Sequence, residues 1–389
     1  MKITLSLTHS CNLACDYCYA GHSMNRHMPF ETARRAIDFA MERTRSGDKI
    51  EIGFFGGEPL LRFEMIKKVV RYIRQQTAQS PRQIVLSITT NGTILSEEIL
   101  DFLEREGIDL CISIDGPKRL HDRHRVYRNG RGSFDDVFAN LQWALQRLSR
   151  VQVNAVYSPD TLAFLPETVA LLIDAGVPSI HLNLNITAKW ERNDWEAFER
   201  VYRQVADLYI DSYRNGREIA INLIDNKIIL FLKGGYSEQD MCGMGKTQWA
   251  FAASGNIYPC ERFIGEDDDA RFQLGNLYTG LDERRRVLIM HQAGNRNEEC
   301  LTCELRPYCM NWCGCTNYYA TGRINLAGPA LCASERAAIE AARHALATLS
   351  DDRCDLFITH MLNYFQPERD ASISVNKEVS DGRKIPMAG

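Results

Sequence analysis

Short apolar runs alternate with amphipathic segments along the first half of this 389-residue chain. The runs are rich in Val, Ile and Leu, have the length of buried parallel strands, and lie at residues 2–8, 50–55, 84–89, 108–114, 151–157 and 179–186. Segments with helical periodicity lie between them, at residues 30–46, 62–77, 95–106, 133–148 and 162–175. Three of these helices are expected to begin at capping residues, Ser96, Ser133 and Asp160. Such repeats predict an α/β fold, an open, partial TIM-like (β/α)6 barrel with its reactive site at the carboxyl ends of the strands.

The length of the chain predicts more than one structural unit. We expect the barrel to occupy residues 1–225 and an irregular, cysteine-rich, metal-held module to occupy residues 226–345. A long amphipathic helix near residues 192–215 would connect the two. Residues 346–389 are expected to form a C-terminal helix and a tail that is partly disordered after about residue 366, because large apolar side chains are few there.

The charge and the hydropathy pattern exclude several kinds of partner. The formal net charge is -4 at pH 7, and no dense Lys/Arg stripe occurs, so we do not expect a nucleic-acid partner. The amino terminus lacks the continuous apolar stretch of a signal peptide, and no run reaches the roughly 18 apolar residues of a membrane span. We therefore expect a cytoplasmic protein without a membrane partner.

Thirteen cysteines are unusual for a chain expected in the cytoplasm, where thiols are kept reduced. Three lie within residues 11–18 and eight within residues 242–332, which leaves Cys111 and Cys354 isolated. Clustering of this kind favours metal ligation over disulfide formation. Cys111 lies inside a predicted strand and is expected to be a small buried apolar residue.

The first group of cysteines directly follows the first predicted strand. Cys11, Cys15 and Cys18 would therefore sit on a loop at the carboxyl end of that strand, where this fold places its chemistry. Three thiolates bind three irons of a [4Fe–4S] cluster and leave the fourth iron open to an exogenous ligand. A zinc knuckle is the alternative, but it would need a fourth local Cys or His that the motif lacks.

Glycine-rich and polar turns end the neighbouring predicted strands. Gly56 and Gly57 permit close approach of the backbone to a ligand, and Glu58 offers an acceptor for an ammonium group. A plain glycine turn is the alternative. Polar turns at residues 89–92 and 113–117 fall on the same expected face as the first cysteines and would line a cofactor pocket.

The second group of cysteines has a regular spacing. Its members are Cys242, Cys260, Cys300, Cys303, Cys309, Cys313, Cys315 and Cys332, with Gly255 five residues before Cys260. Eight cysteines are the number that two fully ligated [4Fe–4S] clusters require. One or two zinc sites are the alternative.

Together these motifs resemble the radical S-adenosylmethionine (SAM) superfamily with its SPASM extension. The matching features are CxxxCxxC with Tyr17 before its last cysteine, the GGEP turn, and CX9–15GX4C, CX2CX5CX3C and C over roughly residues 240–340. The resemblance implies that SAM binds the open iron, is cleaved reductively to a 5′-deoxyadenosyl radical, and takes hydrogen from the substrate. It also implies cofactor contacts from Gly56, Gly57, Glu58, Ser113 and Arg125. A solvated charge at a helix entry is the alternative for Arg125.

In the second region the resemblance implies two auxiliary [4Fe–4S] clusters, and hence three clusters in all. One would take Cys300, Cys303, Cys309 and Cys332, and the other Cys242, Cys260 and Cys313. Sulfatase-maturing members have a further cysteine where this chain has Thr-Gln-Trp at residues 247–249. Cys315 is positioned to replace that cysteine, and an iron left open for substrate is the alternative.

The same resemblance indicates the reaction. Enzymes with this extension mostly oxidise a residue of a peptide, so we expect an oxidoreductase that forms a thioether, ether or carbon–carbon cross-link in a ribosomally synthesised peptide. Formylglycine formation in a sulfatase, dehydrogenation of a small molecule and a non-enzymatic iron–sulfur electron carrier are the alternatives. Glu261 stands where sulfatase-maturing enzymes have a catalytic Asp and is expected to be a general base. A surface acid beside Arg262 is the alternative for Glu261.

The expected partners follow from this reaction. They are a peptide or protein substrate and an external one-electron donor, a flavodoxin or ferredoxin. Peptide-maturing relatives often begin with a leader-binding domain, whereas this chain reaches its cysteine motif by residue 11. A leader-binding protein would therefore be separate or unnecessary.

Overall fold

The computed structural model describes residues 1–292 and 297–365. These residues form one open sheet of eleven strands in the order β11-β10-β9-β8-β1-β2-β3-β4-β5-β6-β7. The central strands are parallel and follow each other in the chain: β1 (Lys2–Ser6), β2 (Lys49–Phe55), β3 (Gln83–Thr90), β4 (Ile108–Ser113), β5 (Val151–Tyr157) and β6 (Ser179–Leu184). All six strands predicted from the apolar runs are confirmed, and with them the α/β fold class.

Shorter strands extend the sheet at both ends. β7 (Ala220–Ile221) runs parallel to β6, and β8 (Gln248–Phe251) runs parallel to β1. The antiparallel strands β9 (Asn256–Tyr258), β10 (Gly275–Asn276) and β11 (Gly280–Leu281) then follow β8. The sheet therefore continues across the predicted boundary at residue 225, because β8 returns to the first strand of the barrel.

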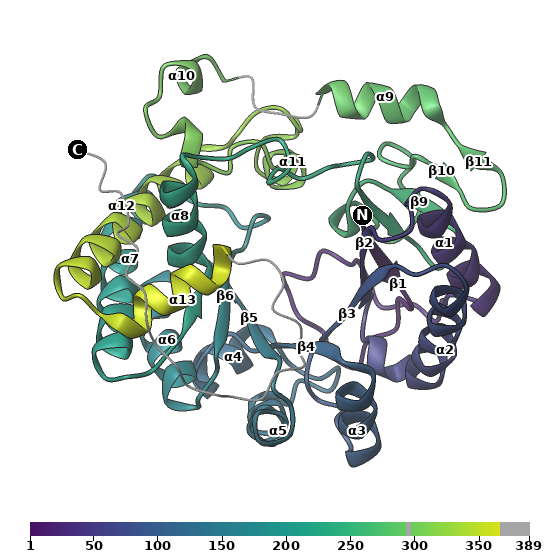
Figure 1. Cartoon of the computed structure of the whole chain (residues 1–389), viewed down its shortest axis with the longest axis horizontal. Helices are drawn as coiled ribbons and strands as arrows, with labels where there is room; N and C mark the ends of the chain where they lie inside the picture. The colour runs from purple at the N-terminus through teal and green to yellow at the C-terminus, as the bar shows by residue number, and fades with distance from the viewer. Residues whose placement is uncertain (293–296, 366–389) are drawn as a thin grey trace.

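Helices cover the outer face of the curved sheet and connect successive strands (Figure 1). They are α1 (Phe30–Glu42), α2 (Phe63–Gln79), α3 (Glu97–Glu106), α4 (Lys118–His124), α5 (Phe134–Arg147), α6 (Leu165–Asp174) and α7 (Arg192–Arg214). Apart from the short α4, each was expected from helical periodicity, and the bounds differ by a few residues.

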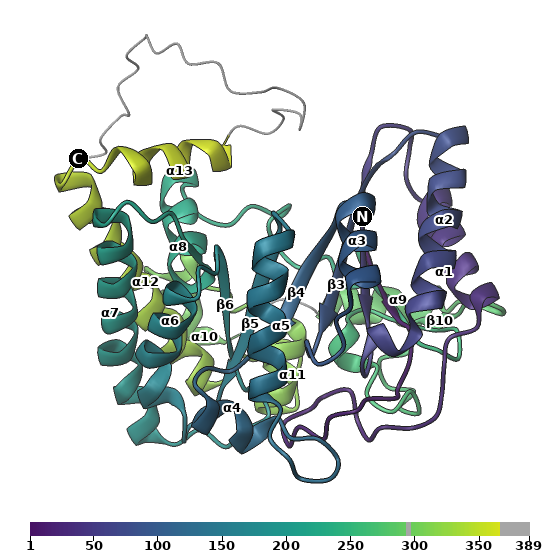
Figure 2. The same ribbon diagram turned by 90° about the horizontal axis from the view of Figure 1, so that it is seen from below.

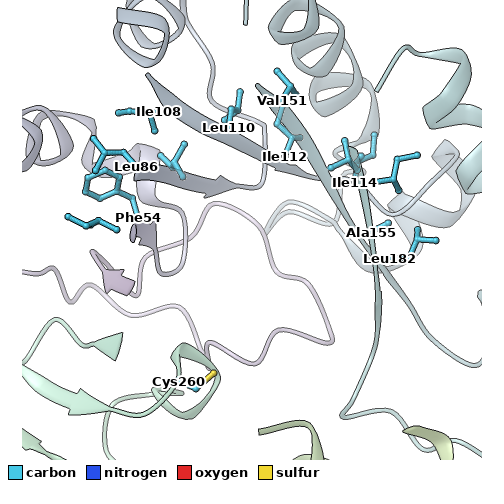
Figure 3. Close-up of a cluster of buried hydrophobic side chains, with 14 of the residues drawn as sticks. Phe54, Leu86, Ile108, Leu110, Ile112, Ile114, Val151, Ala155, Leu182 and Cys260 are labelled. Carbon is cyan, nitrogen blue, oxygen red and sulfur yellow. The ribbon is translucent and has the colours of Figure 1, made fainter. Parts of the chain in front are cut away.

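Alternation along the strands separates an apolar outer face from a more polar inner face. In β5, Val151, Val153 and Ala155 are buried, whereas Gln152 and Asn154 between them are half-buried. The buried side chains pack between the strands and the helices (Figure 3). Cys111 of β4 is half-buried and lies outside the hydrophobic core, so the expectation of a buried apolar residue is wrong. It lies beside Thr89, with which it is hydrogen-bonded.

Of the three expected helix caps, only Ser96 is confirmed; Ser133 and Asp160 make tertiary contacts instead. Ser96 caps α3 as expected, because its hydroxyl oxygen accepts a hydrogen bond from the Ile99 amide at 3.3 Å. Ser133 does not cap α5, because its hydroxyl donates to the Arg125 carbonyl oxygen at 2.9 Å. Asp160 forms an ion pair with Arg123 at 2.7 Å and precedes a short 3-10 turn, η2 (Leu162–Phe164).

Six further helices follow β7 in the part of the chain that the structure describes. They are α8 (Asn222–Lys233), α9 (Glu283–Gln292), α10 (Glu298–Leu301), α11 (Gly314–Thr321), α12 (Pro329–Asp351) and α13 (Asp355–Phe365). α12 lies along α7 (Figure 2), so the cysteine-rich region is packed onto the barrel helices. The tail predicted to be disordered after residue 366 lies outside the described residues. No helix within the described ranges is long and apolar enough to span a membrane.

Candidate functional site

The first three cysteines lie on the loop between β1 and α1, and this loop packs on the end of β2. The Gly57 amide donates to the Thr8 carbonyl oxygen at 2.7 Å, and the Glu58 amide donates to the Ser10 carbonyl oxygen at 2.8 Å. A Cβ atom at Gly57 would lie 2.3 Å from the Ser10 carbonyl oxygen, and one at Gly56 would lie 2.4 Å from the Thr8 carbonyl oxygen. The close approach that these glycines permit is therefore to the chain's own cysteine loop.

Glu58 joins the ends of β2 and β3. Its side chain is fully buried, and its carboxylate accepts hydrogen bonds from the Leu60 amide at 2.9 Å, the Thr90 hydroxyl at 2.7 Å and the Asn91 amide at 2.7 Å. Burial raises the pKa of Glu58 to about 7, although these donors oppose the rise. The carboxylate therefore holds two strand ends together, and its contact with a cofactor amine stays a prediction.

Asn91 connects the end of β3 to the first cysteine. Its side-chain amide donates to the Cys11 sulfur at 3.7 Å and to the Asn12 side-chain oxygen at 2.8 Å. The Leu13 amide also donates to the Cys11 sulfur, at 3.4 Å. Hydrogen bonds to a cluster thiolate tune its electronic properties, so this donor set fits an iron ligand. The sequence marked the turn at residues 89–92 but did not single out Asn91.

The structure brings Cys11, Cys15 and Cys18 together. Burial, together with the nearby Cys18 and Cys11 thiols, raises the pKa of Cys15 to about 12, although Arg125 opposes the rise. Burial also raises the pKa of Cys11. Since iron binds the thiolate, loading of this loop must displace protons from these sulfur atoms.

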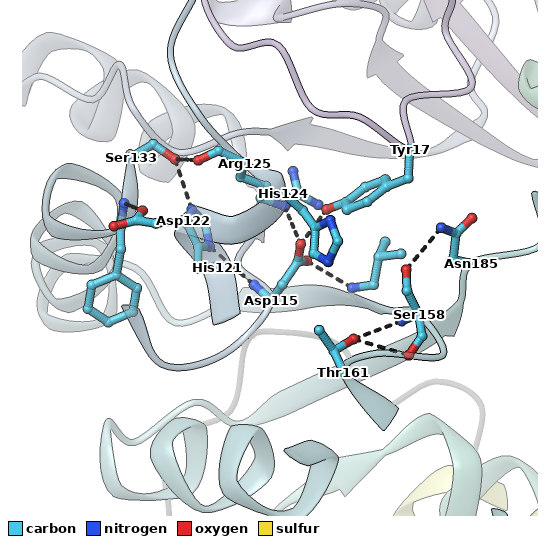
Figure 4. Close-up of polar contacts among 12 residues, drawn as sticks. Tyr17, Asp115, His121, Asp122, His124, Arg125, Ser133, Ser158, Thr161 and Asn185 are labelled. Carbon is cyan, nitrogen blue, oxygen red and sulfur yellow. Dashed lines mark hydrogen bonds and ion pairs between the residues drawn. The ribbon is translucent and has the colours of Figure 1, made fainter. Parts of the chain in front are cut away.

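Arg125 belongs to a buried network at the ends of β4 and α4 (Figure 4). Its Nε donates to the Asp115 carboxylate at 2.9 Å, and its guanidinium lies 5.3 Å from the centre of the Tyr17 ring. The Tyr17 hydroxyl also donates to Asp115. Arg125 is only 7% exposed, so the alternative of a solvated helix-entry charge is wrong. Ser113, at the end of β4, is buried beside this network.

His121 and Ser133 hold the backbone of Arg125. The His121 ring is hydrogen-bonded to the Ser133 hydroxyl at 2.9 Å, and that hydroxyl donates to the Arg125 carbonyl oxygen. Burial lowers the pKa of His121 to about 4, so the ring is neutral near pH 7. Neither His121 nor Asp115 was singled out from the sequence, because their partners lie on other elements.

One group of four cysteines surrounds the start of α11. Cys313 precedes α11 and Cys315 lies in its first turn, with 3.5 Å between the two sulfur atoms. Cys315 is also hydrogen-bonded to Cys260, which precedes the short helix η3 (Glu261–Phe263). Burial, together with the nearby Cys313, raises the pKa of Cys242 to about 12. These four are the cysteines expected for the first auxiliary cluster.

A second group of four cysteines lies on the segment that runs from α10, which contains Cys300, to α12, which contains Cys332. Burial raises the pKa of Cys332, and the nearby Cys300 and Cys303 contribute to the rise, whereas Arg336 opposes it. Burial raises the pKa of Cys309, and Glu335 and Cys332 raise it further. The four thiols are therefore electrostatic neighbours, in the grouping expected for the second auxiliary cluster.

A single metal ion needs several ligand side chains that point to one place. Within residues 1–292 and 297–365, no three His, Cys, Asp or Glu side chains converge on one metal ion.

Glu261 faces the barrel rather than the outer surface. It is half-buried and lines a small cavity together with Gly56, Gly57 and His9. The guanidinium of its neighbour Arg262 lies 5.6 Å from the centre of the Tyr19 ring. Tyr19 directly follows Cys18. The turn that carries Glu261 therefore meets both the cysteine loop and the GGEP turn.

Comparison with known proteins identifies the class. Residues 5–162 match the model of the radical SAM superfamily. Residues 5–162 thus form a radical SAM domain, which confirms the resemblance seen in the motifs of this part of the chain. Membership implies SAM and a [4Fe–4S] cluster as cofactors.

Three relatives have similar sequences over about half or more of the chain's length. An uncharacterized protein of Methanocaldococcus jannaschii is 35% identical over 182 residues, which cover 47% of this chain and 62% of that protein. A cysteine-type anaerobic sulfatase-maturating enzyme of Clostridium novyi is 20% identical over 331 residues, covering 78% and 85% of the two chains. The radical SAM cyclopropyl synthase TigE of Paramaledivibacter caminithermalis is 23% identical over 334 residues, covering 80% and 67%.

Solved structures share the fold. The structure of anSMEcpe with bound AdoMet and the Cp18Cys peptide has a TM-score of 0.77 at 20% identity and covers 90% of this chain and 99% of that one. Streptococcus suis SuiB bound to its precursor peptide SuiA has a TM-score of 0.61 at 17% identity and covers 85% and 75%. At these identities the likeness concerns the fold.

Proposed function

We propose that the chain is a peptide-modifying radical SAM maturase, which abstracts hydrogen from a residue of a ribosomally synthesised peptide and oxidises it to a cross-link. The observation that carries this proposal is the meeting of the cysteine loop, the GGEP turn and Glu261 around one small cavity. Peptide complexes of anSMEcpe and SuiB support a peptide as the substrate class. The relationship to TigE favours ring or bond formation.

The chain's own residues would divide the work as follows. Cys11, Cys15 and Cys18 would hold the cluster, which, with bound SAM, supplies a carbon-centred radical at the barrel mouth. Among the hydrogen bonds of the described residues, those of the Arg125 guanidinium use only Nε, so its two terminal nitrogens are free to bind a cofactor carboxylate. Ser113 would lie beside that carboxylate, and Gly56 and Gly57 would keep the loop close to the cofactor amine.

Glu261 would hold the proton that leaves the substrate residue. Loss of hydrogen and of an electron leaves an acidic centre, and a carboxylate within hydrogen-bond reach can accept its proton. The two auxiliary groups, Cys242, Cys260, Cys313 and Cys315 on one side and Cys300, Cys303, Cys309 and Cys332 on the other, would hold the clusters that accept the electron. An external flavodoxin or ferredoxin would start each turnover, and a separate leader-binding protein could present the peptide.

The test incubates the anaerobically reconstituted chain with dithionite, SAM and one of three substrates. These are peptides encoded next to its gene, a Cys-containing sulfatase peptide, and an aminoglycoside. We expect 5′-deoxyadenosine and a dehydrogenated, internally linked product from the first substrate alone, identified by mass spectrometry. A carbonyl in the sulfatase peptide would establish formylglycine formation instead, and turnover of the aminoglycoside alone would refute a peptide substrate.

The triple variant Cys11→Ala, Cys15→Ala, Cys18→Ala is the control for cofactor cleavage. It should form no 5′-deoxyadenosine and bind about four irons fewer than the roughly 12 of three clusters. Equal cofactor cleavage by this variant would overturn the assignment of the first cluster. No cleavage by the parent chain would favour the electron carrier.

A further inference from the structure

We infer that the buried ion pair of Lys227 and Glu335 clamps the backbone on both sides of Cys309 and thereby sets the redox potential of the second auxiliary cluster. The two are positioning residues, because they contact the peptide groups beside a cluster ligand rather than an iron. The inference rests on the proposed function, which assigns Cys309 to that cluster. The ligands alone do not fix the potential, because hydrogen bonds and nearby charges also tune it.

The pair holds the two peptide groups that flank Cys309. Lys227 Nζ donates at 2.9 Å to the Tyr308 carbonyl oxygen, which belongs to the peptide group before Cys309. The Glu335 carboxylate accepts a hydrogen bond from the Met310 amide, which belongs to the peptide group after Cys309. Lys227 Nζ and the Glu335 carboxylate lie 2.6 Å apart. The ion pair therefore fixes both ends of the residue that carries the sulfur.

Two helices hold this clamp in place around an irregular segment. Lys227 lies in α8, and Glu335 lies in α12, three residues after Cys332. Their side chains are only 5% and 9% exposed. Cys309 itself follows the short helix η4 (Arg306–Tyr308) in an extended conformation. Because Cys309 is in neither a helix nor a strand, its position depends on contacts from outside its own segment.

The clamp also decides which backbone amide serves the Cys309 sulfur. Glu335 occupies the Met310 amide, and the next amide, that of Asn311, donates to the sulfur instead. Asn311 is buried, so this donor is shielded from water. A hydrogen bond to a thiolate stabilises its negative charge and so affects the potential of the cluster it binds. Release of the clamp would free the Met310 amide and loosen this arrangement.

The two members of the pair act on the charge of the cluster in opposite directions. Burial and the nearby Glu335 raise the pKa of the Cys309 thiol, whereas Lys227 opposes the rise. Reduction adds an electron to the cluster, and a nearby anion disfavours this charge while a nearby cation favours it. Glu335→Gln should therefore raise the midpoint potential. Lys227→Met should act in the opposite direction and also take the donor from the Tyr308 carbonyl oxygen.

The experiment compares five anaerobically reconstituted chains: the parent, Glu335→Gln, Lys227→Met, Arg343→Ala and Cys309→Ala. Arg343→Ala is the matched control, because it removes an exposed ion pair with Glu340 on the same helix, α12. Cys309→Ala identifies the signal of the second auxiliary cluster as the signal that it loses. Iron content is measured, and electron paramagnetic resonance spectra are recorded during a redox titration without peptide.

We expect Glu335→Gln to keep the parent iron content and to raise the midpoint potential of that one signal, because the Gln oxygen can still accept from the Met310 amide. Lys227→Met should lower the potential of the same signal and alter its shape. The signals of the other two clusters should match those of the parent, as all three should in Arg343→Ala.

Three outcomes would overturn the inference. They are a potential of Glu335→Gln equal to that of Arg343→Ala, an unchanged signal in Lys227→Met, and loss of all three clusters in both pair variants, since the pair would then only support folding. Because the titration contains no peptide, the expected shifts in a chain that converts no peptide would support this inference and refute the proposed function.

Discussion

Gly57 lies where the cysteine loop packs most closely on the end of β2. A methyl group there would lie 2.3 Å from the Ser10 carbonyl oxygen, and backbone atoms cannot swing aside as a flexible side chain can. We expect Gly57→Ala to displace the loop, at a cost of about 1–3 kcal/mol in the free energy of unfolding. Iron analysis should show a loss of about four irons, with a matching loss of cofactor cleavage.

Gly53→Ala is the matched control for this prediction. Gly53 lies within β2, four residues before Gly57, and a Cβ atom there would meet the Ser87 hydroxyl oxygen at an ordinary 3.6 Å. This variant should keep the iron content of the parent. Equal iron content in both variants would show that the loop does not depend on the close approach at Gly57.

Glu261 is the residue for which proton transfer can be tested directly. Loss of a catalytic base commonly lowers the rate by about 10²–10⁴-fold. Glu261→Gln should therefore keep its clusters and its uncoupled cofactor cleavage but leave the peptide at its unmodified mass. Mass spectrometry of the peptide measures this difference.

Glu266→Gln provides a nearby acid for comparison with Glu261→Gln. Glu266 lies five residues further on and is paired with His22 near the surface. The Glu266→Gln variant should form product at the parent rate. If the Glu261→Gln variant formed product at the same rate, Glu261 would be a structural acid and the proton would need another acceptor.

At the scale of elements, α13 docks on α7 through Phe357, whose ring lies 5.5 Å from that of Tyr213. His360 of α13 is hydrogen-bonded to Glu218 at 3.0 Å and to Asp225 at 3.0 Å. Burial lowers the pKa of His360, but these two carboxylates outweigh it and raise the pKa above its usual value of about 6.5. The imidazolium therefore stabilises the docked helix.

The sign of this effect gives a pH prediction for α13. A raised pKa of His360 means that its stabilisation is complete below about pH 6.5 and is lost as the pH rises through the folded-state value. Hydrogen exchange of residues 355–365, corrected for the intrinsic rate, should show weaker protection at about pH 8 than at about pH 6. His360→Gln should remove this pH dependence, while amides of α3 serve as the internal reference. A dependence that persists in the Gln variant would assign it to another group.

At the scale of the whole molecule, a buried ion pair joins α8, the helix after β7, to α12, the helix that carries Cys332. Lys227 of α8 and Glu335 of α12 lie 2.6 Å apart, with side chains 5% and 9% exposed. Glu335 also accepts a hydrogen bond from the Met310 amide, next to Cys309. Lys227→Met would leave a buried carboxylate without its cation, so the free energy of unfolding should fall by about 3–5 kcal/mol. Urea unfolding of samples with equal iron content would measure this change in the free energy of unfolding.

Two comparison variants make that test specific. Lys227→Met with Glu335→Gln should recover part of the loss, because no unpaired charge remains and the amide oxygen can still accept from Met310. Arg343→Ala removes the exposed Arg343–Glu340 pair of α12 and should change the free energy of unfolding by less than about 1 kcal/mol. Equal effects of Lys227→Met and Arg343→Ala would contradict a special role of the buried pair.

The sequence alone determined the parts of this protein that repeat or that lie close together in the chain. The six central strands were predictable because buried parallel strands are short, continuous apolar runs, and most of the helices were predictable because burial imposes a period of 3.6 on them. The cap at Ser96 was predictable because it acts within one turn of helix. The two cysteine-rich segments were visible because their members follow a regular spacing.

Only the tertiary structure decided the contacts between residues far apart in the sequence. β8 pairs with β1, more than 200 residues away in the chain. The Glu58 carboxylate accepts hydrogen bonds from Thr90 and Asn91. The Ser133 hydroxyl donates to the Arg125 carbonyl oxygen and does not cap its own helix. The division of the eight later cysteines into two groups, around α11 and α12, was proposed from resemblance. Which of these cysteines lie near one another is seen only in the tertiary structure. The physical reason is that strand ends and loops meet through packing of the whole sheet, which leaves neither a period nor a fixed spacing in the chain.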